Sequence, residues 1–138
     1  MTYLEIKKFF LDNVQEIKNN YIKWHRNDCI DFLEEEGLHN FIGNYVEPYF
    51  VDLLQSKNIE ILKCFFDVVE KTLVEAERST VDGVYLDKEY YIEAIEQSLF
   101  EGLDVGENGK TILESCQNHP QISKIMYTLQ EKRRLGQL

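Results

Sequence analysis

The stretch that decides the fold is residues 44–77, which read NYVEPYFVDLLQSKNIEILKCFFDVVEKTLVEAE and contain two helical patterns separated by Ser-Lys-Asn. Asn44 followed three residues later by Glu47 predicts a capping box that opens the first helix. Asn58 predicts the cap of the second helix, whose apolar residues recur every three or four positions. Because a link this short forces neighbouring helices to run antiparallel, residues 45–77 are expected to form a helical hairpin.

The amino-terminal segment carries an apolar stripe with the repeat of a helix. A helix capped by Thr2 is therefore expected over residues 3–19, with an extension to Trp24 left open. Trp24 lies beside His25 and Arg26, an aromatic ring next to a titratable ring and a guanidinium group. Since Trp24 continues the stripe, we expect it to pack in the core more than to bind a ligand. The stripe consists of Tyr3, Ile6, Phe10, Val14, Ile17, Tyr21 and Trp24.

The remaining segments also have helical patterns. Residues 79–86 contain the turn signal Asp82-Gly83 between short β-favouring runs, but we expect an ordered loop there more than a true hairpin, because isolated ribbons are marginal. The sequence thus predicts an all-α fold, a compact bundle of six to seven helices built from antiparallel helical hairpins within one domain, residues 1–138. The further helices are expected at about residues 29–36, 87–103, 110–118 and 121–134.

The charge is large and unevenly placed. The 138 residues include 15 Lys and Arg against 25 Asp and Glu, so the formal net charge is −10. Residues 27–107 hold five basic and twenty acidic groups, whereas the chain from Ser123 onward is basic. An acidic body repels phosphate, so nucleic-acid binding through the centre is disfavoured and a basic protein partner is favoured. No apolar run long enough for a membrane span and no signal-peptide pattern is present, so we expect a soluble cytoplasmic protein.

No group of residues has the spacing of a catalytic or metal site. The cysteines, Cys29, Cys64 and Cys116, are odd in number and far apart, so they are expected to be reduced and partly buried. His25 and Cys29 are four residues apart, but two ligands do not make a zinc site, and the histidines are expected to be partly exposed polar residues. The loop from Gly102 to Gly109 is acidic, which favours a helix-ending loop over a nucleotide site. We therefore expect no enzyme, no metal and no cofactor.

Two stretches resemble a family of small all-helical bacterial proteins. They are residues 43–50, GNYVEPYF, and residues 98–103, SLFEGL, together with the long helix between them. The resemblance covers roughly residues 40–105, and some members of that family are immunity proteins of polymorphic toxin or contact-dependent inhibition systems. It implies that the chain binds and blocks a cognate toxin domain, often a nuclease with a basic cleft. The family has no catalytic residues to transfer to this chain.

Two hypotheses for the function follow, and they differ in the part of this chain that binds the partner. The first is an acidic immunity protein, antitoxin-like, that covers a basic toxin surface. The second is a helical adaptor or regulator that binds a peptide or protein through a groove between hairpins. An enzyme with an unfamiliar carboxylate site, or with a site centred on His25, is the least favoured alternative. The residues expected to bind the partner are Glu34, Glu35, Glu36, Glu47, Asp52, Tyr90, Glu101, Asp104 and Glu107.

Overall fold

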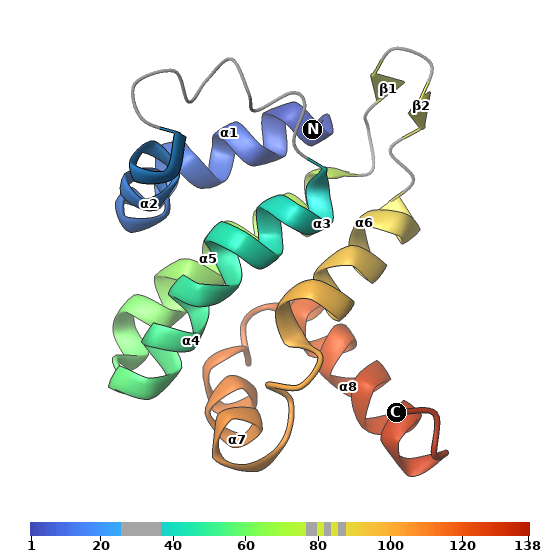
Figure 1. Cartoon of the computed structure of the whole chain (residues 1–138). Helices are drawn as coiled ribbons and strands as arrows, with labels where there is room; N and C mark the ends of the chain where they lie inside the picture. Colours follow the sequence, from blue (N-terminus) through green and yellow to red (C-terminus); the bar gives the residue numbers. More distant parts are fainter. Residues whose placement is uncertain (26–36, 77–79, 82–83, 86–87) are drawn as a thin grey trace.

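The computed structural model describes residues 1–25, 37–76, 80–81, 84–85 and 88–138 and confirms an all-α fold (Figure 1). The segments α3, η2 and α4 follow one another without a break, as do α6 and η4, so the described residues form seven helices in all. The elements are α1 (Tyr3–Asn13), α2 (Gln15–His25), α3 (Leu38–Phe41), the π-helix η2 (Ile42–Val46), α4 (Glu47–Ser56), α5 (Ile59–Glu75), β1 (Thr80–Val81), β2 (Val84–Tyr85), α6 (Lys88–Ile95), the π-helix η4 (Glu96–Phe100), α7 (Gly106–Ser115) and α8 (Pro120–Arg134).

The expected first helix is in fact two helices, α1 and α2, because Val14 adopts an extended backbone with φ −131° and ψ 99°. The Oγ1 atom of Thr2 accepts a hydrogen bond from the backbone N–H of Glu5 at 3.0 Å, which confirms the expected cap. The helical region does reach Trp24, but the Trp24 side chain is 73% exposed. Core packing of Trp24 is therefore wrong: the turn at Val14 redirects the chain, and the buried stripe of α2 ends at Tyr21.

The core is rich in aromatic rings that meet edge-on or tilted. In the amino-terminal half, Tyr21 lies 4.9 Å from Tyr45 and 6.0 Å from Phe41 between ring centroids. In the centre, Phe50 of α4 lies 5.3 Å from Phe100 of η4. Such pairs stabilise a core beyond the burial of their area. They join segments far apart in sequence into one continuous core.

The expected capping box at Asn44 and Glu47 is wrong, because the chain is already helical before it. No side chain caps α4, and the backbone N–H of Glu47 donates to the carbonyl of Ile42, five residues earlier. Pro48 explains the widened turn: a proline ring collides with the carbonyl four residues before it in a regular α-helix. The π turn of η2 ends at Val46, two residues before Pro48, and accommodates the ring without ending the helix.

The hairpin of α4 and α5 is confirmed, and the two helices lie side by side in Figure 1. Lys57 ends α4 in the left-handed region with φ 55°, and Asn58 caps α5 by accepting from the N–H of Ile61 at 3.3 Å. Two connecting residues, Lys57 and Asn58, thus reverse the chain, one fewer than the three that the sequence suggests, because Ser56 is still part of α4. This hairpin provides the helix α5, against which α8 packs.

The structure corrects two expectations after α5. The ordered loop expected over residues 79–86 contains the short antiparallel strands β1 and β2, in which Thr80 pairs with Tyr85 and Val81 with Val84. Helix α7 begins at Gly106, about four residues earlier than expected. A side chain at Gly109 would collide with the carbonyl oxygen of Asp104, so this glycine allows a close approach between loop and helix.

Candidate interaction surface

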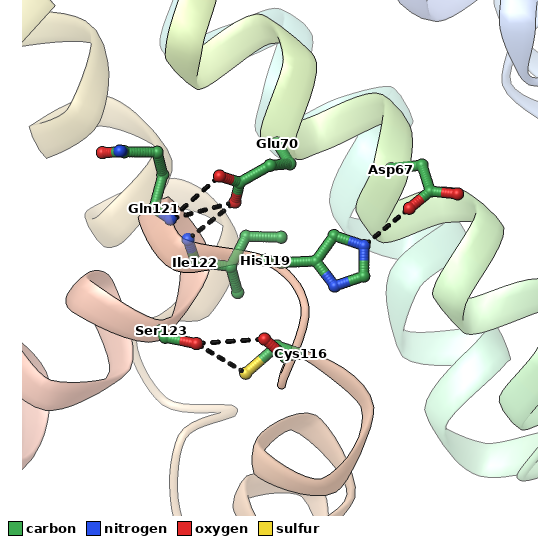
Figure 2. Close-up of polar contacts among 7 residues, drawn as sticks. All are labelled: Asp67, Glu70, Cys116, His119, Gln121, Ile122 and Ser123. Atoms are coloured by element: carbon green, nitrogen blue, oxygen red, sulfur yellow. Dashed lines mark hydrogen bonds and ion pairs between the residues drawn. The ribbon is translucent and has the colours of Figure 1, made fainter.

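The amino terminus of α8 is capped by a side chain from another helix (Figure 2). The Glu70 carboxylate, on α5, accepts hydrogen bonds from the backbone N–H groups of Gln121 and Ile122 at 2.9 to 3.1 Å. Pro120 opens α8 and has no N–H, and no side chain caps the helix locally. Glu70 therefore satisfies the free N–H groups of the first turn and places a negative charge at the positive end of the helix dipole.

His119, in the link before α8, is buried, which corrects the expectation of a partly exposed side chain. Its Nε2 atom lies 2.7 Å from Oδ1 of Asp67, and its ring packs against Phe66 with centroids 5.8 Å apart. Its Nδ1 atom has no hydrogen-bond partner in the described part of the chain. The side chain thus ties the α7–α8 link to α5, next to the Glu70 contact.

Cys116 completes this polar cluster without forming a catalytic pair. Figure 2 shows Cys116 turned toward Ser123, with Sγ 3.6 Å from the Ser123 hydroxyl, while His119 is turned toward Asp67. Burial raises the pKa of the Cys116 thiol. A thiol kept protonated in this way is a poor nucleophile, so the cluster has a structural role.

The carboxyl end of α8 is held by two buried carboxylates. Lys132 Nζ lies 2.7 Å from Glu96 Oε2, and Arg133 binds both oxygens of Asp104, through Nε at 2.6 Å and Nη2 at 2.7 Å. The Arg133 guanidinium hydrogen bond lowers the pKa of Asp104, and the Glu96 hydrogen bond raises the pKa of Lys132. The bidentate contact fixes the orientation of both groups and is the stronger of the two.

These contacts neutralise much of the basic carboxyl end within the molecule. Lys132 and Arg133 pair with carboxylates from other segments, and Arg134 pairs with Glu131 at 2.8 Å on the surface of α8. Lys124 is exposed and has no ion pair among the described residues. The basic stretch from Ser123 onward therefore has fewer unpaired cations than its residue count suggests.

Asp104 is the clear error among the residues expected to bind a partner. Its side chain is fully buried against Arg133, so it cannot present its charge to another protein. Sequence reasoning missed its partner because Arg133 lies 29 residues further along the chain. Glu101 and Glu107, on either side of it, are exposed.

The other expected residues lie on separate segments. Asp52 is exposed on α4, while Glu47, in the first turn of the same helix, is half-buried. Five residues apart, they point to different sides of the helix. Tyr90 is exposed on α6, as expected from its neighbour Tyr91, which is buried. Glu34, Glu35 and Glu36 lie outside the described residues.

Tyr90 belongs to a surface cluster that sequence reasoning missed. Its ring lies 5.9 Å from that of His39, and His39 Nδ1 lies 2.7 Å from the Ser98 hydroxyl. A serine beside a histidine resembles a nucleophile and its base. Such a pair also needs an orienting group and donors for an oxyanion, and the described contacts of these residues include neither. We interpret the pair as a contact between α3 and η4.

A groove runs between α6 and α8, with a volume of about 280 Å³. Glutamates line it on the α6 side, and lysines line it on the α8 side. Ile92 and Ile125 contribute apolar surface to it, and Ile125 itself is buried. No signal in either helix alone identifies this feature, since it depends on how the two helices pack.

Neither metal binding nor membrane insertion finds support in the part of the chain that the structure describes. No three His, Cys, Asp or Glu side chains there are grouped in a way that would hold a metal ion. No helix there combines the length and the apolar character needed to cross a bilayer. Comparisons of the chain with family models, curated proteins and solved structures gave no match.

Proposed function

We propose that this chain is an acidic immunity protein, antitoxin-like, that binds and neutralises a basic toxin domain in the bacterial cytoplasm. The observation that carries the proposal is the internal pairing of Lys132 and Arg133 with buried carboxylates. Each pair also uses one carboxylate of residues 27–107, yet those residues hold twenty acidic against five basic groups, so their excess of carboxylates remains. The same role is implied by the resemblance of residues 43–50 and 98–103 to a family of small all-helical bacterial proteins, some of which are immunity proteins.

Charge favours this role for kinetic reasons. A net charge of −10 on a chain of 138 residues attracts a basic surface from a distance and speeds its encounter. Fast association suits a protein that must intercept a toxin before the toxin acts. Exposed aromatic side chains such as Tyr90 supply anchors at the surface.

The test is to co-express the chain with the protein encoded beside its gene and to measure bacterial growth and the association rate. We expect growth to be rescued and association to slow as salt rises. Glu34→Gln, Glu35→Gln and Glu36→Gln combined, or Glu101→Gln with Glu107→Gln, should slow association by about two- to tenfold. Lys110→Gln, a charge change of opposite sign on α7, should speed it slightly. The proposal would be contradicted if co-expression left the toxicity in place, or if the association rate were the same in all these variants and at every salt concentration.

The groove between α6 and α8 favours the second candidate, a helical adaptor. Its apolar surface and opposed charges suit a peptide or helix of another protein. An adaptor that binds there through apolar contacts should hold its partner with little dependence on salt. Co-purification with a non-toxic partner that survives high salt would favour this reading over immunity.

A further inference from the structure

The groove between α6 and α8 is formed by one stripe from each helix. The positions on α6 follow the spacing i, i+3, i+4 and i+7, and those on α8 add a further turn, so each set lies on a single helix face. The first stripe, on the continuous rod of α6 and η4, consists of Glu89, Ile92, Glu93 and Glu96, and the α8 stripe consists of Gln121, Lys124, Ile125, Thr128 and Lys132.

The charges of the groove are separated by side. All the carboxylates come from the α6 side, and both lysines come from α8. At one end Glu96 and Lys132 meet across the groove at 2.7 Å and close it. Further along, the Glu93 carboxylate accepts a hydrogen bond from the side-chain amide of Gln97, one turn later, at 3.1 Å. Lys124 has no ion pair in the described structure. Glu93 and Lys124 do not form an ion pair with each other across the groove. These two charges are therefore available to another molecule.

We propose that this groove receives an amphipathic helix of the partner protein, with cations along the flank facing α6 and carboxylates along the flank facing α8. The apolar face of that helix would cover Ile92, which is half-buried and lies beside the buried Ile125. The inference rests on the protein-binding role that both functions proposed above share, and it adds the segment that the partner inserts. Charge complementarity selects this occupant: a wholly basic helix meets Lys124, and a wholly acidic helix meets Glu93.

The length of the groove limits the occupant. From Gln121 to Lys132 the α8 stripe spans eleven steps, about 16 Å at the rise of an α-helix. A helix of three turns therefore suffices to contact both sides. It would lie beside α6 and α8 as a third helix, in the manner of helix-in-groove recognition.

The experiment uses three synthetic helical peptides of equal length, with the same apolar stripe, and the full isotopically labelled chain. One peptide carries basic residues on one flank and acidic residues on the other, one is basic on both flanks, and one is acidic on both. Binding is followed by NMR titration. We expect the bipolar peptide to bind most tightly and to shift the amide signals of α6 and α8.

Single charge changes in the groove sharpen the test. Lys124→Glu makes both sides acidic, so the bipolar peptide should bind about three- to tenfold more weakly and the wholly basic peptide should bind best. Lys110→Glu is the matched control, since it makes the same charge change at an exposed site on α7. It should leave the order of the three peptides unchanged. Lys124 has no ion pair to lose, so its replacement should not unfold the chain.

Several results would overturn the inference. One is equal binding of the three peptides, and another is an equal response to Lys124→Glu and Lys110→Glu. Self-association that Lys124→Glu abolishes would make a second copy of this chain the occupant instead. If the peptides fail while the product of the neighbouring gene still binds and is neutralised, the groove inference fails and the immunity proposal stands. If the bipolar peptide binds as expected but no toxin encoded by the neighbouring gene is neutralised, the groove inference stands and the immunity proposal fails.

Discussion

The amino-terminal helices and the carboxyl-terminal helix α8 are fixed to the core in different ways. Around α3, the fully buried Phe41 packs against the rings of Phe10, Tyr21 and Tyr45, without charged groups in the contact. Helix α8 also buries apolar residues, but carboxylates from other segments hold both of its ends. The first kind of contact depends on shape and burial, and the second also depends on pH. The difference makes it possible to weaken one region selectively.

The largest effect is expected from Phe41→Ala. It removes a fully buried ring that touches three other rings, so the free energy of unfolding should fall by about 3–5 kcal/mol. Urea unfolding followed by circular dichroism measures the change. Tyr127→Ala is the control, since that ring is 65% exposed and its loss should change stability by less than about 0.5 kcal/mol. Similar losses for both variants would contradict an aromatic core around α3.

Arg133→Ala tests the polar attachment of α8 and should have the next largest effect. It leaves the buried Asp104 carboxylate without its bidentate partner, which should destabilise the protein by about 1–3 kcal/mol. Its neighbour Arg134 pairs with Glu131 on the surface, so Arg134→Ala should change stability by less than about 0.5 kcal/mol. The same unfolding measurement compares them. An Arg133→Ala variant as stable as Arg134→Ala would show that the Asp104 contact does not hold α8.

Glu70→Ala should have a smaller effect, about 0.5–2 kcal/mol, because it removes the cap of α8 but no buried ring. Amide hydrogen exchange should speed up first at Gln121 and Ile122, which lose their acceptor. Glu75→Ala, on the same helix, is the matched control, since Glu75 only approaches Lys71 at 3.9 Å on the surface. Unchanged exchange at the two amides would contradict capping by Glu70.

The smallest effect concerns pH. Arg133 lowers the pKa of Asp104 in the folded protein, so this carboxylate adds stability above its unfolded pKa and loses it as pH falls through the folded value. Asp104→Asn should therefore be less stable than the wild type at neutral pH, by about 1 kcal/mol. The gap should shrink in acid. Unfolding curves over a pH series check this, and a constant gap at every pH would rule the linkage out.

Helix positions followed well from local sequence, and their exceptions have physical causes. The hairpin around Asn58 and the start of α8 after His119 rest on caps and breakers that act within a few residues. The break at Val14 and the exposure of Trp24 depend on how α2 crosses the core, which an apolar repeat does not encode. The strands β1 and β2 pair with each other although an isolated two-stranded ribbon is only marginally stable.

The candidate surface was harder to predict than the fold. Glu101 and Asp104 look alike in the sequence, yet one is exposed and the other is buried against Arg133. What separates them is a partner contributed by another helix, so no local signal distinguishes them. The groove between α6 and α8 likewise depends on how two helices pack against each other, and neither helix alone has a sequence pattern that predicts it.

The π turn at Ile42–Val46 has a consequence for length changes in the gene. A π turn holds one residue more than the α-helical repeat, so deletion of a single residue there would restore regular winding. The residues beyond it on the same rod would keep their faces, because the five residues of the π turn and the four residues of a regular turn sweep nearly the same angle. Phe50, Leu53 and Leu54 would stay on the buried face, but the Pro48 ring would meet the carbonyl four positions before it, so the deletion would strain the helix without exposing the core.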